Sequence, residues 1–320
     1  MTNEKNIFDK LNARRYQKDK AIPVENIAFT IQNKTIGCLQ SFVTLSGLPK
    51  QGKSLFITSA IASAFTGQAI FDMKLTFPEN RDRLCYVDTE SSDYDYYKVL
   101  ERMKRQMNKT ELPENFDSFL FREDSHTDIL QMIELYLKQH PDCSILIIDG
   151  VLDLIADFNN VEQSFSLIQW LKKISKVHNL LICLILHLGK KEGNTLGHIG
   201  SYLDRKSQSV LKVEKNKQQR TIDLTAQFLR SADDIDTIAI AHNGFEWIQT
   251  KHTTETNQPI WTKDKIELIN RVVKQPIEFK ELIHDLSLVI GKSESTAKKI
   301  LKEWINSGAI VKKGKFYQKK

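Results

Sequence analysis

Long apolar runs are missing from this sequence, since none reaches the roughly 18 residues that a bilayer-spanning helix requires. The first residues, Met-Thr-Asn-Glu-Lys, also lack the apolar core of a secretory signal. We therefore expect a cytoplasmic protein with no membrane partner.

Cysteine is scarce as well, with four residues among 320. Each lies in or beside an apolar, strand-like segment, and none has the spacing of metal ligands. This usage argues against disulfides and a zinc site, and it predicts buried free thiols in a reducing compartment. The four residues are Cys38, Cys85, Cys143 and Cys183.

Most of the chain has no excess of positive charge, although the formal net charge of the full sequence is +6. From residue 262 onward there are 14 basic and 7 acidic residues, an excess of +7, whereas the remainder has 32 basic and 33 acidic side chains. A basic terminal segment suggests a polyanionic partner. Lysine-rich ends also occur for solubility alone, so the charge leaves both interpretations open.

Apolar segments of strand length alternate with helical patterns along residues 27–248, without internal repeats or low-complexity tracts. The expected strands are 38–45, 83–88, 119–121, 144–148, 180–186, 210–213, 221–224 and 237–241, and the expected helices are 55–65, 97–107, 129–139 and 162–178. Because the strands are apolar throughout, the pattern predicts an α/β fold with a mostly parallel sheet flanked by helices. Residues 27–36 are typical of a strand pair, and residues 189–206 are expected to form a mobile surface loop.

A phosphate-binding loop is the most specific motif. It comprises Gly47, Leu48, Pro49, Lys50, Gln51, Gly52, Lys53 and Ser54. Glycines at both ends let successive backbone N–H groups point inward, and the following helix adds the positive end of its dipole. Lys53 supplies a charge for the β- and γ-phosphates of ATP, and the Ser54 hydroxyl is expected to ligate Mg²⁺. The motif lies between an apolar strand and a helix, which is the context that this chemistry requires.

Asp149 is the expected second half of this site. It ends the apolar run 144–148, so it should lie beside the phosphate loop at the carboxyl edge of a parallel sheet. A carboxylate there can hold a water of the Mg²⁺ shell.

These motifs resemble the RecA/DnaB superfamily of ATPases, and specifically the RepA-type hexameric helicases of plasmids and mobile elements. The resemblance spans about residues 25–248 and includes segments 47–54, 86–90, 145–149, 184–187 and 213–217. It implies that Glu90 is the base that polarises the attacking water, with Asp88 as a competing candidate. It also implies that His187 senses the γ-phosphate at the end of its strand.

The resemblance further implies that residues 188–206 hold the DNA-facing loop of a central channel. Lys190, Lys191 and His198 could contact phosphates there, although a solvated polar loop is the alternative. The sequence departs from the family here, because Ile199-Gly200-Ser201 replaces a frequent Arg-Gly-Ser. Nearby basic residues that could substitute are Arg205 and Lys206.

Lys215 and Lys217 resemble the basic pair that reaches the ATP site of a neighbouring subunit, and Arg220 is a further candidate. A cation supplied by the neighbouring subunit would make ATP hydrolysis depend on assembly, which implies a homo-oligomeric ring. The resemblance to the family implies that this ring is a hexamer. The alternative is a strand with an exposed basic face.

The basic C-terminal segment reads as a winged helix, with helices at 263–273, 279–286 and 294–306 and a basic hairpin at 309–317. Lysines 292, 298, 299 and 302 are placed for a DNA backbone, although winged helices also bind proteins. The expected division is an N-terminal arm (1–25), a RecA-like ATPase domain (26–249), a linker (250–261) and a winged-helix domain (262–320).

Together these patterns predict an ATP-dependent motor on single-stranded or duplex DNA that works with a replication or mobilisation protein. A non-unwinding ATPase that loads or remodels such a partner is the main alternative. The paired lysines and the winged helix argue against a third possibility, a small-molecule kinase. A fourth is a transcriptional regulator that would use the winged helix and treat ATP as a switch.

Overall fold

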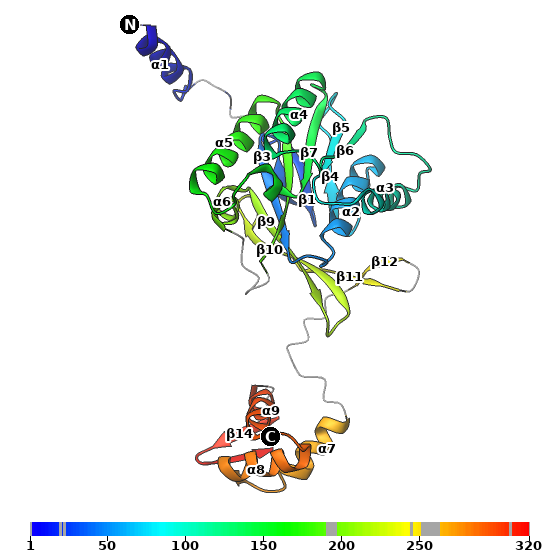
Figure 1. Ribbon diagram of the computed structural model, residues 1–320, viewed down its shortest axis with the longest axis vertical. Helices are drawn as coiled ribbons and strands as arrows, with labels where there is room; N and C mark the ends of the chain where they lie inside the picture. The colour runs from blue at the N-terminus through cyan, green and yellow to red at the C-terminus, as the bar shows by residue number, and fades with distance from the viewer. Residues whose placement is uncertain are drawn as a thin grey trace. The chain divides into compact units, whose positions relative to one another are not determined.

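The computed structural model describes residues 2–18, 21, 24–189, 197–243, 246–250, 263–306 and 309–319. The chain divides into two compact units, Met1–His252 and Thr253–Lys320 (Figure 1). None of the described helices is long and apolar enough to span a bilayer.

One large sheet organises the first unit. Its strands are β3 (Ser41–Gly47), β5 (Arg83–Asp88), β6 (Phe116–Leu120), β7 (Cys143–Asp149), β8 (Leu181–His187), β9 (Ser209–Asn216), β10 (Thr221–Leu229), β11 (Ile238–His242) and β12 (Trp247–Thr250). They lie in the order β12-β11-β10-β9-β3-β8-β7-β5-β6, and the six from β9 to β6 are parallel to one another. The predicted α/β fold with a mostly parallel sheet is therefore confirmed.

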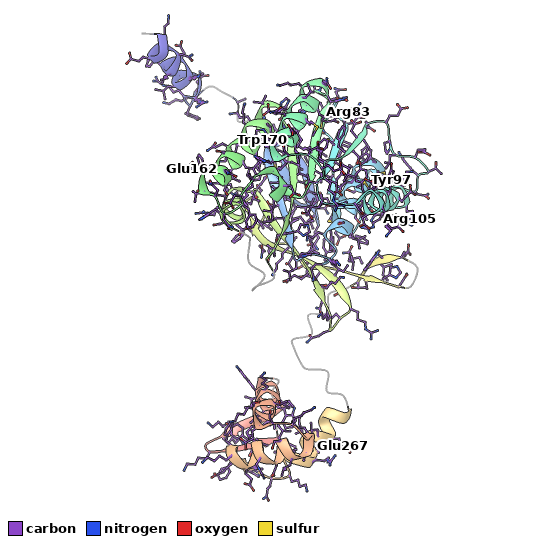
Figure 2. The ribbon with its side chains drawn as sticks, viewed as in Figure 1. Arg83, Tyr97, Arg105, Glu162, Trp170 and Glu267 are labelled. Carbon is purple, nitrogen blue, oxygen red and sulfur yellow. The ribbon has the colours of Figure 1, made fainter. Side chains whose placement is uncertain are left out.

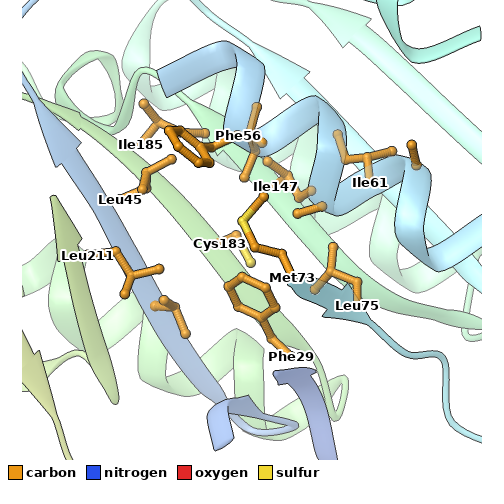
Figure 3. Packing of buried hydrophobic residues seen from close by; sticks show 14 of the residues in the cluster. Phe29, Leu45, Phe56, Ile61, Met73, Leu75, Ile147, Cys183, Ile185 and Leu211 are labelled. Atoms are coloured by element: carbon orange, nitrogen blue, oxygen red, sulfur yellow. The ribbon is translucent and has the colours of Figure 1, made fainter. Parts of the chain in front are cut away.

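Helices cover both faces of this sheet. On one face α2 (Lys53–Thr66) and α3 (Asp93–Met107) pack in one apolar cluster, which a small sheet of β1 (Ile27–Ile31), β2 (Lys34–Cys38) and β4 (Met73–Leu75) completes. Figure 3 shows members of this cluster, among them Phe56 of α2, Ile185 of β8 and Phe29 of β1. The other face carries α4 (His126–Gln139), α5 (Val161–Val177) and α6 (Gly197–Lys206), with the short helix η1 (Val151–Leu154). Aliphatic strands buried on both faces explain the continuous apolar runs of the sequence.

The prediction of a loop over residues 189–206 is wrong for the second half of this segment. Residues 197–206 form α6, and both Ile199 and Leu203 are fully buried in the core. These two side chains are one helical turn apart, so they share the face that packs on the sheet. The glycine and lysine content of the segment concealed this short amphipathic pattern.

The strand predicted over residues 38–45 is also interrupted. Cys38 ends β2, and the chain turns at Leu39 and Gln40, where Gln40 has a φ of 64°, before β3 begins. The short strands β4 and β12 were not predicted, because three or four residues are too few to show a period. The N-terminal arm contains a helix, α1 (Thr2–Ala13).

The second unit has three helices and a three-stranded sheet of order β13-β15-β14 among its described residues. The elements are α7 (Lys263–Val272), β13 (Ile277–Glu278), α8 (Phe279–Ile290), α9 (Glu294–Asn306), β14 (Ile310–Lys313) and β15 (Phe316–Lys319). Leu282, Leu301 and Trp304 are among the buried side chains that form its separate core. The predicted helix at 294–306 has the bounds of α9, and α8 extends beyond its predicted end at residue 286.

Candidate nucleotide site

The phosphate loop connects the end of β3 to the start of α2 through backbone that favours glycine. Gly52 has a φ of 101° directly before α2, and Lys50 has a φ of 63°. A Cβ on Gly47 would lie 2.5 Å from the carbonyl oxygen of Val213, and a Cβ on Gly52 would lie 2.7 Å from Ile222. Glycine is required at position 47 because a side chain would displace the backbone of β9. At position 52 a side chain would be strained by the positive φ and would press on the side chain of Ile222.

Lys53 is folded into this loop. Its side chain is buried, and Nζ donates to the carbonyl oxygens of Gly47 (2.8 Å) and Leu48 (2.9 Å). Burial lowers the pKa of Lys53 to about 8, although the nearby charges of Asp149 and Glu90 oppose that shift. An anion at the loop would stabilise the ammonium, because buried charges need a compensating partner.

His187 and Glu90 lie next to this lysine. In the parallel pairing of β3 with β8, His187 is the partner of Gly47, and its Nδ1 lies 3.4 Å from Lys53 Nζ. The opposite ring nitrogen, Nε2, lies 2.9 Å from Oε2 of Glu90. The three residues expected to act in catalysis thus form a continuous chain of contacts at the carboxyl edge of the sheet.

The carboxylates beside this chain are held by a tyrosine that the sequence reasoning missed. Asp88 and Asp149 are register partners of β5 and β7, and the buried Tyr86 hydroxyl lies 3.1 Å from Oδ2 of Asp149 and 3.3 Å from Oδ2 of Asp88. Asp88 Oδ1 accepts the backbone N–H of Glu90 (3.0 Å) and that of Ser91 (2.8 Å). Asp88 is therefore buried and occupied in fixing the backbone of Glu90. A tyrosine in an otherwise aliphatic strand was the available signal.

Burial raises the pKa of Asp149 to about 6, and the negative charges of Asp88 and Glu90 raise it further than the Tyr86 hydrogen bond lowers it. Thr89, which the sequence reasoning also did not identify, donates from its hydroxyl to Oδ2 of Asp153 (2.7 Å). A carboxylate whose charged form is disfavoured in this way gains from a cation.

The side chains gathered here fit a magnesium nucleotide. Lys53 and the backbone of the loop supply the donors that phosphates require, and the Ser54 hydroxyl and the Asp149 carboxylate supply oxygen ligands. Mg²⁺ in phosphate-transfer sites typically takes one or two protein oxygens and completes its shell with phosphates and water.

Lys215 lies near the end of β9 and Lys217 follows that strand directly, both beside the phosphate loop of their own chain. The backbone N–H of Lys215 donates to Oε1 of Gln51 (2.6 Å), and both lysines line one cleft with Leu48 and Gln51. Their side chains are exposed, as is Arg220 in the following turn. The cations are thus near a nucleotide site and accessible to a neighbouring molecule.

The predicted DNA-facing residues are only partly described. Lys190 and Lys191 lie outside the described residues, and His198 is exposed at the start of α6. The isoleucine that replaces the family arginine, Ile199, is a core residue. The substitutes suggested for it, Arg205 and Lys206, are exposed at the end of α6.

Comparison with protein families decides the class of this unit. A family model described as AAA domain matches residues 34–193, half of the chain. The chain belongs to this AAA domain family. The match contains the phosphate loop, Glu90, Asp149 and His187 and stops before Lys215, so it supports a P-loop ATPase that binds a nucleotide. No curated protein matches the chain.

Proposed function

We propose that this chain is an ATP-driven motor that assembles into a hexameric ring of identical subunits and translocates on single-stranded DNA, like the RepA-type helicases of plasmids and mobile elements. The observation that carries the proposal is the contact chain from Lys53 through His187 to Glu90. It joins the phosphate-binding group, the residue that reports on the γ-phosphate and the base for water.

In this proposal Glu90 polarises the attacking water, and Asp88 is a positioning residue that holds the backbone of Glu90. His187 touches both Lys53 and Glu90, so a change at the γ-phosphate would alter its hydrogen bonds and reach β8 and the residues after it. When bound through Ser54 and Asp149, Mg²⁺ would neutralise charge on the phosphate oxygens.

The ring is proposed from the exposed lysines at the end of β9 and just after it. Lys215 and Lys217 would contact the nucleotide of the neighbouring subunit, so that hydrolysis requires assembly. Their place beside the phosphate loop is consistent with a nucleotide shared between two subunits.

The second unit is proposed to be a winged helix that binds DNA. Its three helices and small sheet fit that architecture, with β14 and β15 as the wing. The exposed lysines available to a phosphate backbone are Lys292, Lys298, Lys299 and Lys302. Residues 26–249 would then be the ATPase domain, and most of the proposed linker (250–261) lies outside the described residues.

A non-unwinding ATPase that loads or remodels a replication or mobilisation protein is the second candidate. The exposed apolar side chains of α1 favour it, because Ile7, Phe8 and Leu11 lie within one turn of each other and suit a protein surface. Strand unwinding distinguishes the two candidates.

The deciding experiment is ATP hydrolysis by the full chain with and without single-stranded DNA, next to Lys53→Ala and with the subunit number measured by native mass spectrometry. We expect DNA to stimulate hydrolysis, Lys53→Ala to abolish it, and Lys215→Ala to abolish it without preventing ring assembly. ATP hydrolysis that DNA does not stimulate, or a monomer that hydrolyses ATP at full rate, would contradict the proposal of a DNA motor.

A further inference from the structure

A second groove lies on the outer side of α2, between α3 and the β11–β12 strands. Figure 1 shows β11 and β12 on the same side of the unit as α2 and α3. The lining combines apolar, cationic and aromatic side chains, among them Leu55, Arg102, Arg105, Gln106, His242 and Trp247. Leu55 directly follows the phosphate loop, so the groove begins close to the nucleotide site without sharing its charged residues.

Two arginines of α3 reach this groove without an acidic partner. Among the described residues, no carboxylate lies within 4.0 Å of the guanidinium of Arg102 or Arg105, although Glu246 lines the same groove. The lysines of the same helix are paired, Lys98 with Asp95 (3.7 Å) and Lys104 with Glu101 (2.9 Å). Figure 2 labels Arg105 on this helix. The helix therefore neutralises its other cations and leaves these two available.

The surroundings of Arg102 make an anion favourable. Burial lowers the pKa of Arg102, and the positive charge of Arg105 lowers it further. A partly buried guanidinium beside a second one is costly unless an anion joins them. Gln106 does not help to hold that anion, because its buried Oε1 is an acceptor and its Nε2 already donates to Ser59 (2.7 Å). The two guanidinium groups are therefore the groups assigned to the anion.

An aromatic surface completes the groove. Trp247 is 37% exposed, and its ring meets the ring of His242 edge-on with centroids 5.2 Å apart. Other tryptophans have structural places, because Trp304 is 2% exposed and the indole of Trp170 donates to Glu134 (2.8 Å). An accessible indole near unpaired arginines is the combination that holds nucleotide units by stacking and charge.

We propose that this groove binds a nucleotide unit separate from the one at the phosphate loop, with its base against Trp247 and its phosphate against Arg102 and Arg105. Two sources share this chemistry, a strand of single-stranded nucleic acid and a free nucleotide. The charge pattern selects a phosphate-bearing ligand, and the indole selects one that also carries a flat ring.

The test uses the full chain carrying Lys53→Ala, which disables the phosphate loop, and measures the fluorescence of Trp247 as the difference from the same protein with Trp247→Phe. The ligands are a short oligothymidylate, ATP and inorganic tripolyphosphate. We expect the oligothymidylate or ATP to quench Trp247, whereas tripolyphosphate does not. The ligand that quenches identifies the source.

Affinity variants test the residues assigned to the phosphate and the base. Their affinities are measured by the fluorescence anisotropy of dye-labelled oligothymidylate or ATP in the Lys53→Ala background, since Trp247→Ala removes the tryptophan signal. Arg102→Ala and Trp247→Ala should each weaken binding about tenfold, as loss of one stacked base or charged contact does. Lys98→Ala is the matched control, because it removes a paired cation from the same helix and should leave binding unchanged. Thermal unfolding of each variant separates a loss of binding from a loss of folding.

Three results would overturn the inference. Quenching by ATP only when Lys53 is intact would assign the groove to the base of the nucleotide at the phosphate loop. Equal binding of tripolyphosphate without quenching would indicate a bare anion site, and no response to any ligand would leave the groove without this role. The decisive titrations use the disabled loop, and the chain with intact Lys53 serves only for the first of these comparisons. Failure of the proposed ATPase motor would therefore appear in hydrolysis assays and not here.

Discussion

The two ends of the large sheet differ in whether their charged side chains are paired with other groups of the chain. At the amino end, just before β5, the guanidinium of Arg81 donates to the carbonyl oxygens of Pro141 (3.0 Å), Asn179 (2.9 Å) and His178 (2.7 Å), and also to that of Cys143. One side chain thereby joins the segments that lead into three adjacent strands.

Arg83, labelled in Figure 2, continues this pattern at the first residue of β5. It pairs with Asp117 and Asp142, each at 2.8 Å. Partial burial raises the pKa of Asp142, but the hydrogen bond and charge of Arg83 outweigh that effect and hold it below its ordinary value. The charges of this end are satisfied within the chain.

At the carboxyl end the same strands bring like charges together. Burial and then the charges of Asp88 and Glu90 raise the pKa of Asp149, while burial lowers the pKa of Lys53. The charged side chains at the amino end of the sheet therefore stabilise the fold, whereas those at the carboxyl end would be stabilised by a ligand. Substitutions at the two ends should therefore separate stability from activity.

The largest effect is expected from Glu90→Gln, which keeps the shape of the side chain and removes its ability to take a proton. Loss of a general base lowers kcat roughly 10²–10⁴-fold, and nucleotide binding should remain because the phosphate contacts are intact. Steady-state hydrolysis and fluorescent-nucleotide binding measure the two quantities. Glu101→Gln, an acid on exposed α3 surface, is the control, and an unchanged kcat in Glu90→Gln would remove this residue from the chemistry.

At the opposite end, Arg81→Ala should lower the free energy of unfolding by about 3 kcal/mol, because several backbone carbonyls lose a charged donor at once. Urea unfolding checks this, and the kcat of the folded fraction should stay unchanged. Arg122 is exposed near the carboxyl end of the sheet, so Arg122→Ala should lower the free energy of unfolding much less. Equal losses from both variants would contradict the division between the two ends.

The pH dependence of stability should have opposite signs at the two ends. Asp149 has a raised pKa, so its contribution to stability is present below about pH 4 and is lost as the pH rises through about 6. Asp142 has a lowered pKa, so its contribution is present at neutral pH and is lost on acidification below about pH 4. For Asp149 the change in stability is on the order of 3 kcal/mol, because each pKa unit corresponds to about 1.4 kcal/mol.

Unfolding free energies measured from pH 3 to pH 7 for Asp149→Asn and Asp142→Asn test these signs in the nucleotide-free protein. Asp149→Asn should reduce the loss of stability between about pH 4 and 6, and Asp142→Asn should reduce the loss on acidification. Parallel changes in the two variants would show that both carboxylates are in equivalent environments.

The smallest effect is expected from Arg83→Lys, at about 1 kcal/mol in the free energy of unfolding. A lysine keeps the charge but cannot reach two carboxylates with separate nitrogens, as Arg83 reaches Asp117 and Asp142. The urea midpoint is the measurement, and Lys98→Arg on α3 is a control for exchanging the two cations. No change in Arg83→Lys would mean that geometry at this end matters less than charge.

Much of this description was available from local pattern. The phosphate loop from Gly47 to Ser54 is specific because few other backbones demand glycine at both ends and a cation between an apolar strand and a helix. Continuous aliphatic runs ending in Asp149 and His187 indicated buried parallel strands, and parallel strands bring their carboxyl ends to one edge. Local chemistry was sufficient to identify these residues.

The remaining features depend on contacts between distant segments. That His187 meets both Lys53 and Glu90 follows from the register of β8 on β3, and that Tyr86 joins Asp88 to Asp149 follows from the pairing of β5 with β7. That Arg102 has no carboxylate partner among the described residues, and that it lines one groove with Trp247, likewise appear only when α3 and β12 are placed together.

The sequence by itself therefore determined the chemistry that is available and the class of fold, because motifs and hydrophobic periods are local. Only the tertiary structure decided which charges are buried, which are paired and which remain for a ligand, since burial and distance arise when strands and helices far apart in the chain are packed together.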